Sequence, residues 1–183
     1  MTRLNAIDPD KATGKAKELL DGVKKKLGIT PNLMRTMANS PAVLEGYLNF
    51  SGALAGGSLS AKLREQIALT VGESNQCQYC VSAHTAIGKM VGLNEDDIDA
   101  SRNSTSKDPK TEAALRFAKK IVLARGELKD EEVNLVRQAG YTDGEIAEII
   151  ANVALNIFTN YFNHIAQTEV DFPKVELGVK TAA

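Results

Sequence analysis

The chain has 183 residues, of which 43% are hydrophobic and 25% charged, so it can bury the core of a single domain spanning 1–183. Its 22 basic and 23 acidic residues leave a net charge of -1, which argues against a surface for nucleic acid or anionic membranes. No run reaches the roughly 18 apolar residues of a membrane span, and the first residues lack the apolar core of a secretory signal. We therefore expect a cytoplasmic protein with small or neutral partners.

Apolar residues recur every three or four positions and alternating β-branched runs are few, which predicts an all-α fold. Proline, glycine and capping residues such as Ser60 and Asn94 place the helix ends. The predicted helices cover approximately 13–26, 31–37, 41 to within 52–57, 60–73, 77–91, a short helix after Asn94, 110–125, 130–139 and 143–168. The polar stretch 101–110 is the one candidate linker, and 171–183 is predicted to be an extended tail.

The last predicted helix has an apolar face broader than a small bundle needs. That face comprises Ile146, Ile149, Ile150, Val153, Ile157, Tyr161 and Ile165. We expect part of it to contact another subunit.

Chemistry-bearing residues concentrate in 65–84, which holds both cysteines, one of the two histidines and a carboxylate twelve residues before the first cysteine. On a helix, Cys77, Cys80 and His84 fall on one inward-facing stripe, whereas Gln78, Ser82, Thr85 and Lys89 fall on the opposite side. Neighbours three and four apart can meet, and this spacing puts the cysteine Cα atoms roughly 5 to 6 Å apart, within disulfide range. A helix N-terminus and a nearby imidazole also favour a thiolate.

Two carboxylates compete as the partner of His84. Glu73 shares a polar face with Lys62 and Gln66, as a solvated residue would, whereas small and apolar residues flank Glu65. If the two helices fold back about a turn near Asn75, Glu65 lies within one turn of His84. We therefore favour Glu65 as the group that exchanges a proton with His84, which in turn serves Cys80.

Other interpretations remain open for the same residues. A buried cysteine is often only a small hydrophobe, and His84 is also compatible with a hydrogen-bonded core position. Glu65 has Arg64 and Arg116 as alternative ion-pair partners. Cys77, Cys80, His84 and Glu65 are four potential zinc ligands, but three would come from a single helix, which is unusual for structural zinc, so no metal is expected. His164 is either structural or part of a pocket.

The pattern of Glu, eleven residues, Cys-x-x-Cys, three residues and His resembles the carboxymuconolactone decarboxylase-like superfamily, in particular its alkylhydroperoxidase-D-like branch. Flanking segments resemble the peroxidase-related subgroup: Pro31-Asn32-Leu33, Met37-Ala-Asn-Ser-Pro41, Cys77-Gln-Tyr-Cys80 with Ala83-His84, Thr159-Asn-Tyr-Phe-Asn163-His164 and Asp171-Phe-Pro173. The resemblance implies a multi-helix orthogonal bundle with the redox site on an antiparallel helix pair.

The resemblance also implies the roles of the site residues in a thiol peroxidase acting on hydrogen peroxide or organic hydroperoxides. Cys80 would attack the peroxide, Cys77 would resolve the sulfenic acid as a disulfide, and Glu65 and His84 would relay protons. Tyr79 stands where the best-studied branch has a further relay histidine, which bears on substrate range and efficiency. Tyr79, Asn160 and His164 are the further candidate pocket residues.

No glycine-rich nucleotide fingerprint is present, so no cofactor is expected and the electrons would come from an external dithiol, such as a lipoylated protein. The resemblance implies a homo-oligomer, a trimer or a hexamer built from trimers. Two other functions remain open: an enzyme that decarboxylates or hydrolyses a lactone, which would not need the thiols, and a redox sensor that oxidises without turnover.

An offset of 80 residues superposes Glu65 on Glu145 and His84 on His164, and puts Asn160 on Cys80. The remaining identity is poor. This gives a weak hypothesis of an internal repeat relating 60–91 to 140–168, which requires two superposable helical hairpins.

Overall fold

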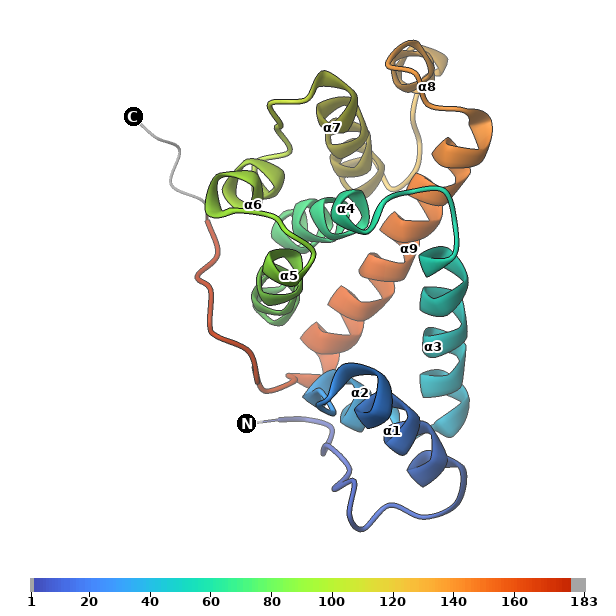
Figure 1. Ribbon diagram of the computed structural model, residues 1–183, viewed down its shortest axis with the longest axis vertical. Helices are drawn as coiled ribbons and strands as arrows, with labels where there is room; N and C mark the ends of the chain where they lie inside the picture. Colours follow the sequence, from blue (N-terminus) through green and yellow to red (C-terminus); the bar gives the residue numbers. More distant parts are fainter. Residues whose placement is uncertain (1, 179–183) are drawn as a thin grey trace.

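The computed structural model describes residues 2–178, and all regular structure in this range is helical (Figure 1). The helices are α1 Gly14–Leu27, α2 Asn32–Met37, α3 Pro41–Ala55, α4 Ala61–Ser74, α5 Gln78–Met90, α6 Glu95–Arg102, α7 Pro109–Leu123, α8 Asp130–Gln138 and α9 Asp143–Ala166. The all-α prediction is confirmed. Within residues 2–178, no helix is both long and apolar enough to cross a membrane.

Local capping chemistry explains why the helix ends lie close to the predicted ones. The Ser60 side chain accepts a hydrogen bond from the Leu63 N–H, and Asn94 begins α6 with a reciprocal pair of bonds to Asp97. Gly28 ends α1 with a φ of 77°, a left-handed conformation that glycine adopts without steric cost. These signals act within one helical turn, so the sequence alone can locate them.

Helix α4 lies at the centre of the molecule, where it packs against α5, α6, α7 and α9 (Figure 1). Ile67 and Val71 join the core formed with α7, α8 and α9, whereas Leu69 packs toward α6. On the α5 side, a Cβ added to Gly72 would lie 3.4 Å from Val81 Cγ2 and 3.5 Å from Cys80 Cβ. The missing side chain of Gly72 therefore lets the cysteine helix approach α4 closely.

Side chains of α9 form hydrogen bonds with the turn between α4 and α5. Cys77 N–H closes the turn by donating to the Gly72 carbonyl at 2.9 Å. The Asn75 side-chain amide donates to Asn160 Oδ1 at 2.9 Å, and the Asn75 carbonyl accepts from His164 Nε2 at 2.8 Å. This arrangement fixes the antiparallel helix pair that the sequence predicts.

Two predictions about irregular segments need correction. The stretch 101–110 is no linker, because Ser101 and Arg102 are buried and Thr70 Oγ1 donates to the Ser101 carbonyl at 2.6 Å. The tail 171–178 is extended but packed: Val175 N–H donates to Ser82 Oγ at 3.0 Å, and an Arg102 N–H donates to the Glu176 carbonyl at 2.6 Å. The remainder of the predicted tail, 179–183, lies outside the described residues.

The internal-repeat hypothesis gains no support. Residues 143–166 form one uninterrupted helix rather than a hairpin. Glu145 accepts the Thr142 N–H at the start of α9, whereas His164 contacts Asn75 at the other end. A 24-residue helix cannot superpose on the α4–α5 hairpin, so the matching spacing does not reflect a shared structure.

Candidate active site

The two cysteines lie at the start of α5, inside the protein. Cys77 is the residue before the helix and Cys80 is in its first turn; their sulfur atoms lie at disulfide distance and their Cα atoms are 5.3 Å apart. Cys77 is 1% exposed and Cys80 is 2% exposed. The Cys80 N–H donates to Cys77 Sγ at 3.3 Å, so the first sulfur faces the positive end of the helix, which favours negative charge on it.

Glu65 meets His84, as the sequence predicts. Glu65 Oε2 lies 2.7 Å from His84 Nδ1, and the two side chains are 18% and 22% exposed. An ionised Glu65 accepts the Nδ1 proton of the ring, which leaves Nε2 as the basic nitrogen. Among the described residues, neither Arg64 nor Arg116 pairs with Glu65. Arg116 pairs with Glu112, and Arg64 donates to three backbone carbonyls, those of Leu54, Ala55 and Leu59.

Glu73 is not the solvated residue that its helical position suggests. Its side chain is 11% exposed, and Glu73 Oε2 accepts from Arg102 Nε at 2.8 Å. Glu73 Oε1 also accepts the Gly178 N–H at 2.7 Å. Helix α6 and the C-terminal segment cover this face of α4, so Glu73 is a structural carboxylate and does not join the cysteines.

A cavity of about 550 Å³ opens beside the second cysteine. Cys80, His84 and Glu65 all line it, whereas Cys77 does not. The rest of the wall is largely apolar and includes Leu33, Met34, Leu54, Ala68, Ala86, Ile87, Leu155 and Phe172. Of the two cysteines, Cys80 is thus the one that borders this cavity, next to the Glu65–His84 pair.

Tyr79 also lines the cavity, but its environment suits packing rather than proton transfer. Its hydroxyl accepts the Leu33 N–H at 3.1 Å, and its ring meets Phe172 edge to face with centroids 5.8 Å apart. Burial raises the pKa of Tyr79 far above its ordinary value, and the nearby Asp171 charge acts in the same direction. Tyr79 thus remains a neutral phenol. Burial likewise raises the pKa of the cavity residue Tyr47 to about 12.

Asn160 and His164, the other candidate pocket residues, do not line this cavity and instead hold Asn75 in the α4–α5 turn. The sequence interpretation missed Asn163, whose Nδ2 donates to Cys80 Sγ at 3.3 Å. It also missed Asn152, Asn156 and Thr159, which line the cavity. The buried asparagines at 152, 156, 160 and 163 recur every three or four residues on a largely apolar helix, and this spacing was the available signal.

Among residues 2–178, no three His, Cys, Asp or Glu side chains are grouped as ligands for a metal ion. The site combines two cysteines at disulfide distance, an imidazole–carboxylate pair and a largely apolar cavity. Such an arrangement can deprotonate a thiol and bring an organic molecule to the sulfur.

Comparison with known proteins supports the resemblance in the sequence. Residues 41–120 match the model of the Carboxymuconolactone decarboxylase family. No curated protein matches this chain.

Solved structures share the fold over nearly the whole chain. An alkylhydroperoxidase AhpD core, peroxidase-related protein from Ralstonia eutropha JMP134 has a TM-score of 0.84 and 24% identity, covering 93% of this chain and 92% of that chain. A peroxidase-related protein from Silicibacter sp. TM1040 has a TM-score of 0.79 and 24% identity, with 92% and 94% covered. A variant of the debrominase Bmp8 in complex with 2,3,4-tribromopyrrole has a TM-score of 0.80 and 20% identity, with 93% and 92% covered. Residues 41–120 are thus similar to the Carboxymuconolactone decarboxylase family, and the chain has the fold of the alkylhydroperoxidase AhpD core.

Proposed function

We propose that this protein is a thiol peroxidase that reduces organic hydroperoxides with Cys80 and Cys77. The observation that carries the proposal is the placement of the two sulfurs: Cys80 lines the cavity together with His84 and Glu65, whereas Cys77 lies behind it at disulfide distance. The sulfur that reaches the cavity attacks the substrate, and the hidden sulfur reacts with the product of that attack.

The first step transfers one oxygen atom to sulfur. His84 Nε2 takes the proton of the Cys80 thiol while Glu65 stabilises the imidazolium through Nδ1. The thiolate attacks the terminal oxygen of the hydroperoxide, so an S–O bond forms and the O–O bond breaks. Sulfur is oxidised by two electrons, and the alkoxide leaves as an alcohol after taking the proton from His84.

The second step forms the disulfide. The Cys77 sulfur attacks the sulfenic acid of Cys80, so the S–S bond forms and the S–O bond breaks. The hydroxide combines with the proton of the Cys77 thiol and leaves as water. An external dithiol, such as a lipoyl group, then reduces the disulfide and is itself oxidised, with Cys77 favoured as the departing thiolate by the Cys80 N–H that faces it.

The cavity favours organic hydroperoxides over hydrogen peroxide as substrates. Its volume of about 550 Å³ far exceeds the space that hydrogen peroxide needs, and its wall is mainly apolar. Transfer of an apolar group from water into such a site contributes roughly 25 cal/mol per Å² of buried apolar surface. A hydrophobic substituent on the peroxide would therefore increase kcat/KM.

The test is a stopped-flow count of thiols after one equivalent of cumene hydroperoxide is added to the reduced, metal-free protein. We expect loss of both thiols, a Cys77–Cys80 disulfide in the mass spectrum, and reversal by dihydrolipoamide. Cys77→Ser should stop at the sulfenic acid, and Cys80→Ser should not consume peroxide. Peroxide consumption by Cys80→Ser at the parent rate would refute the assignment.

Three further measurements separate the competing functions. Release of bromide from 2,3,4-tribromopyrrole, without peroxide consumption, would indicate the activity named for the structural neighbour. Conversion of a lactone after both thiols are blocked would indicate a decarboxylase or hydrolase. Stoichiometric oxidation without turnover in the presence of dithiol would indicate a redox sensor.

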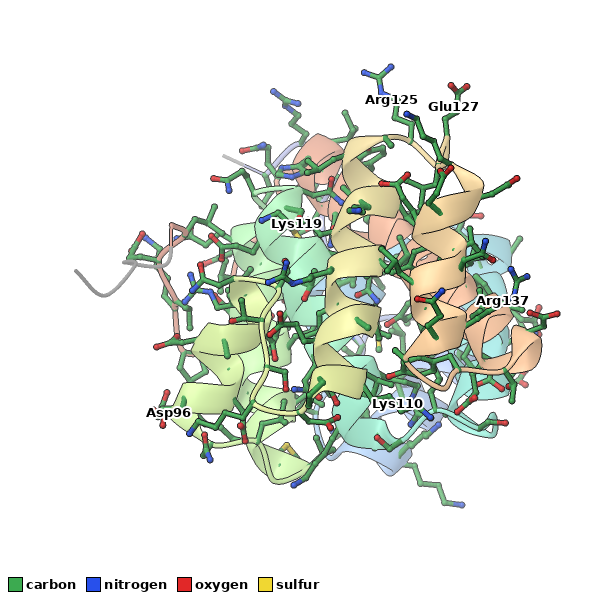
Figure 2. The ribbon with its side chains drawn as sticks, turned by 90° about the horizontal axis from the view of Figure 1, so that it is seen from above. Asp96, Lys110, Lys119, Arg125, Glu127 and Arg137 are labelled. Carbon is green, nitrogen blue, oxygen red and sulfur yellow. A yellow bond between two sulfur atoms is a disulfide. The ribbon has the colours of Figure 1, made fainter. Side chains whose placement is uncertain are left out.

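We also propose that the protein forms a homo-oligomer through α9. The exposed side of this helix carries Ile150, Phe158, Tyr161 and Ile165, and 149–166 contains no Asp, Glu, Lys or Arg. By contrast, Arg125, Glu127 and Arg137 extend outward around α7 and α8 (Figure 2). An uncharged apolar strip suits a second copy of the chain.

Light scattering tests the proposed oligomer. The parent protein should have the mass of a trimer or hexamer, and Tyr161→Glu should reduce the measured particle mass. A parent protein that is monomeric at high concentration would refute the proposal.

A further inference from the structure

Asn163 contacts the sulfur on which the proposed chemistry occurs. It projects from the last turn of α9, and its Nδ2 lies 3.3 Å from Cys80 Sγ. The two residues are 83 positions apart in the chain, and Asn163 is only 5% exposed. This contact is therefore a tertiary one, shielded from water.

The other polar atom of the Asn163 side chain is its carbonyl oxygen, Oδ1. Asn163 Oδ1 is buried and has no hydrogen-bond partner among the described residues. Among the described residues, Cys80 Sγ is therefore the one hydrogen-bond partner of the Asn163 side chain.

We infer that Asn163 is a further catalytic residue, whose side-chain N–H stabilises the Cys80 thiolate. The inference rests on the proposed function only in naming Cys80 as the attacking thiol. An N–H that points at sulfur interacts more strongly with a thiolate than with a neutral thiol or a disulfide, because the acceptor then carries a full negative charge. In the buried site this hydrogen bond has little competition from water.

Several other ionisable groups lie near Cys80, and none of those that line the cavity is on α9. Cys77 directly precedes α5, His84 lies within α5, and Glu65 faces His84 from α4. The ionisable residues that line the cavity with Cys80 are Lys26, Tyr47, Arg64, Glu65, Tyr79 and His84. The residues that α9 contributes to the cavity wall are all uncharged. Replacing Asn163 with a neutral side chain leaves every one of these charges in place.

The test measures the pH dependence of alkylation of Cys80 by iodoacetamide, without peroxide. Because the chain has two cysteines, Cys77→Ser leaves Cys80 as the only thiol. In this background Asn163→Leu removes the N–H at similar volume, and Asn163→Asp replaces the amide with a carboxylate. The matched control is Asn160→Leu, a buried asparagine of the same helix that binds Asn75 rather than sulfur.

We expect Asn163→Leu to raise the alkylation midpoint by about one pH unit, the shift produced by losing a hydrogen bond to a charged group. Asn163→Asp should raise the midpoint further, because a carboxylate repels the thiolate. This variant also tests the inference if Asn163→Leu fails to fold. Asn160→Leu should lower the melting temperature without moving the midpoint. Folded Asn163 variants with an unchanged or lower midpoint would overturn the inference. A raised midpoint in a protein that does not reduce peroxide would support it while refuting the proposed function.

Discussion

Glu65 Oε2 and His84 Nδ1 lie 2.7 Å apart, joining two residues 19 positions apart across the α4–α5 pair. We expect Glu65→Gln to lower the rate of Cys80 oxidation by tenfold or more, because a neutral amide stabilises the imidazolium less than a carboxylate does. The measurement is the second-order rate constant with cumene hydroperoxide at pH 7. A rate within a factor of two of the parent would show that the carboxylate charge is dispensable.

Glu73→Gln is the matched control for the oxidation rate, because Glu73 is the second carboxylate of α4. Glu73 pairs with Arg102, and both side chains are almost buried, at 11% and 7% exposure. In Glu73→Gln the buried Arg102 charge keeps, among the described residues, only the more distant Asp99, at 3.8 Å, so the free energy of unfolding should fall by about 3 kcal/mol. Urea denaturation should detect this loss, whereas the oxidation rate of the folded protein should stay near that of the parent.

The size of the cavity predicts a change of substrate preference in Ala86→Phe. Ala86 lines the cavity wall, and a phenyl group there would occupy the space proposed for the organic part of the substrate. We expect KM for cumene hydroperoxide to rise by about tenfold, while the rate with hydrogen peroxide changes little. The control is Ala113→Phe, in a separate cavity of about 540 Å³ beside α7 and α8. Equal losses for both peroxides would argue against selection by this cavity.

Tyr79→Phe should destabilise the protein through a lost backbone contact. The mutation leaves the buried Leu33 N–H without the hydroxyl that accepts it at 3.1 Å. An unsatisfied buried donor costs about 1–3 kcal/mol, so we expect a decrease in the free energy of unfolding within this range. Urea denaturation provides the measurement, and Tyr141→Phe is the control, because Tyr141 is also buried but its hydroxyl accepts no backbone N–H among the described residues. Equal effects of the two mutations would contradict this role.

Glu148→Gln should reveal a pH-dependent contribution to stability. Glu148 accepts N–H groups of Ser58 and Leu59 at 2.9 and 3.0 Å, and these bonds lower the pKa of its carboxyl below the ordinary 4.5. A lowered folded-state pKa stabilises the protein above pH 4.5, and this stabilisation is lost as the pH falls through the folded-state value.

We therefore expect the parent to be more stable than Glu148→Gln by about 1 kcal/mol at pH 7, the ordinary size of one hydrogen bond. The difference should shrink below pH 4.5. Urea titrations between pH 7 and pH 3 provide the measurement. A constant difference over the whole range would mean that the ionised carboxylate is not responsible.

The sequence predicted those features of the site that depend on short separations. Cys77, Cys80 and His84 share one side of α5 because residues three and four apart are neighbours on any helix. The Glu65–His84 contact followed from a short turn between two antiparallel helices, which fixes which residues lie opposite each other. The Tyr79 difference is also visible in the sequence, but its packing against Phe172 and its bond to Leu33 are not.

The predictions that failed concern which segment covers a helix face. Periodicity separates the two sides of α4 and α5, yet it does not say that α6 and the C-terminal segment bury Glu73 and Ser82. Sequence spacing has the same limitation. Glu145 and His164 are separated by as many residues as Glu65 and His84, yet Glu145 and His164 lie on one continuous helix rather than on a hairpin.

The sequence by itself therefore determined the helices, the dithiol and its imidazole–carboxylate partner, because capping, periodicity and a short turn are encoded within about twenty residues. Only the tertiary structure decided which cysteine lines the cavity and placed Asn163 beside Cys80, 83 residues away in the chain. Such contacts depend on how α3, α4, α5 and α9 pack together. Packing is the sum of many weak apolar contacts, and no single local pattern specifies its result.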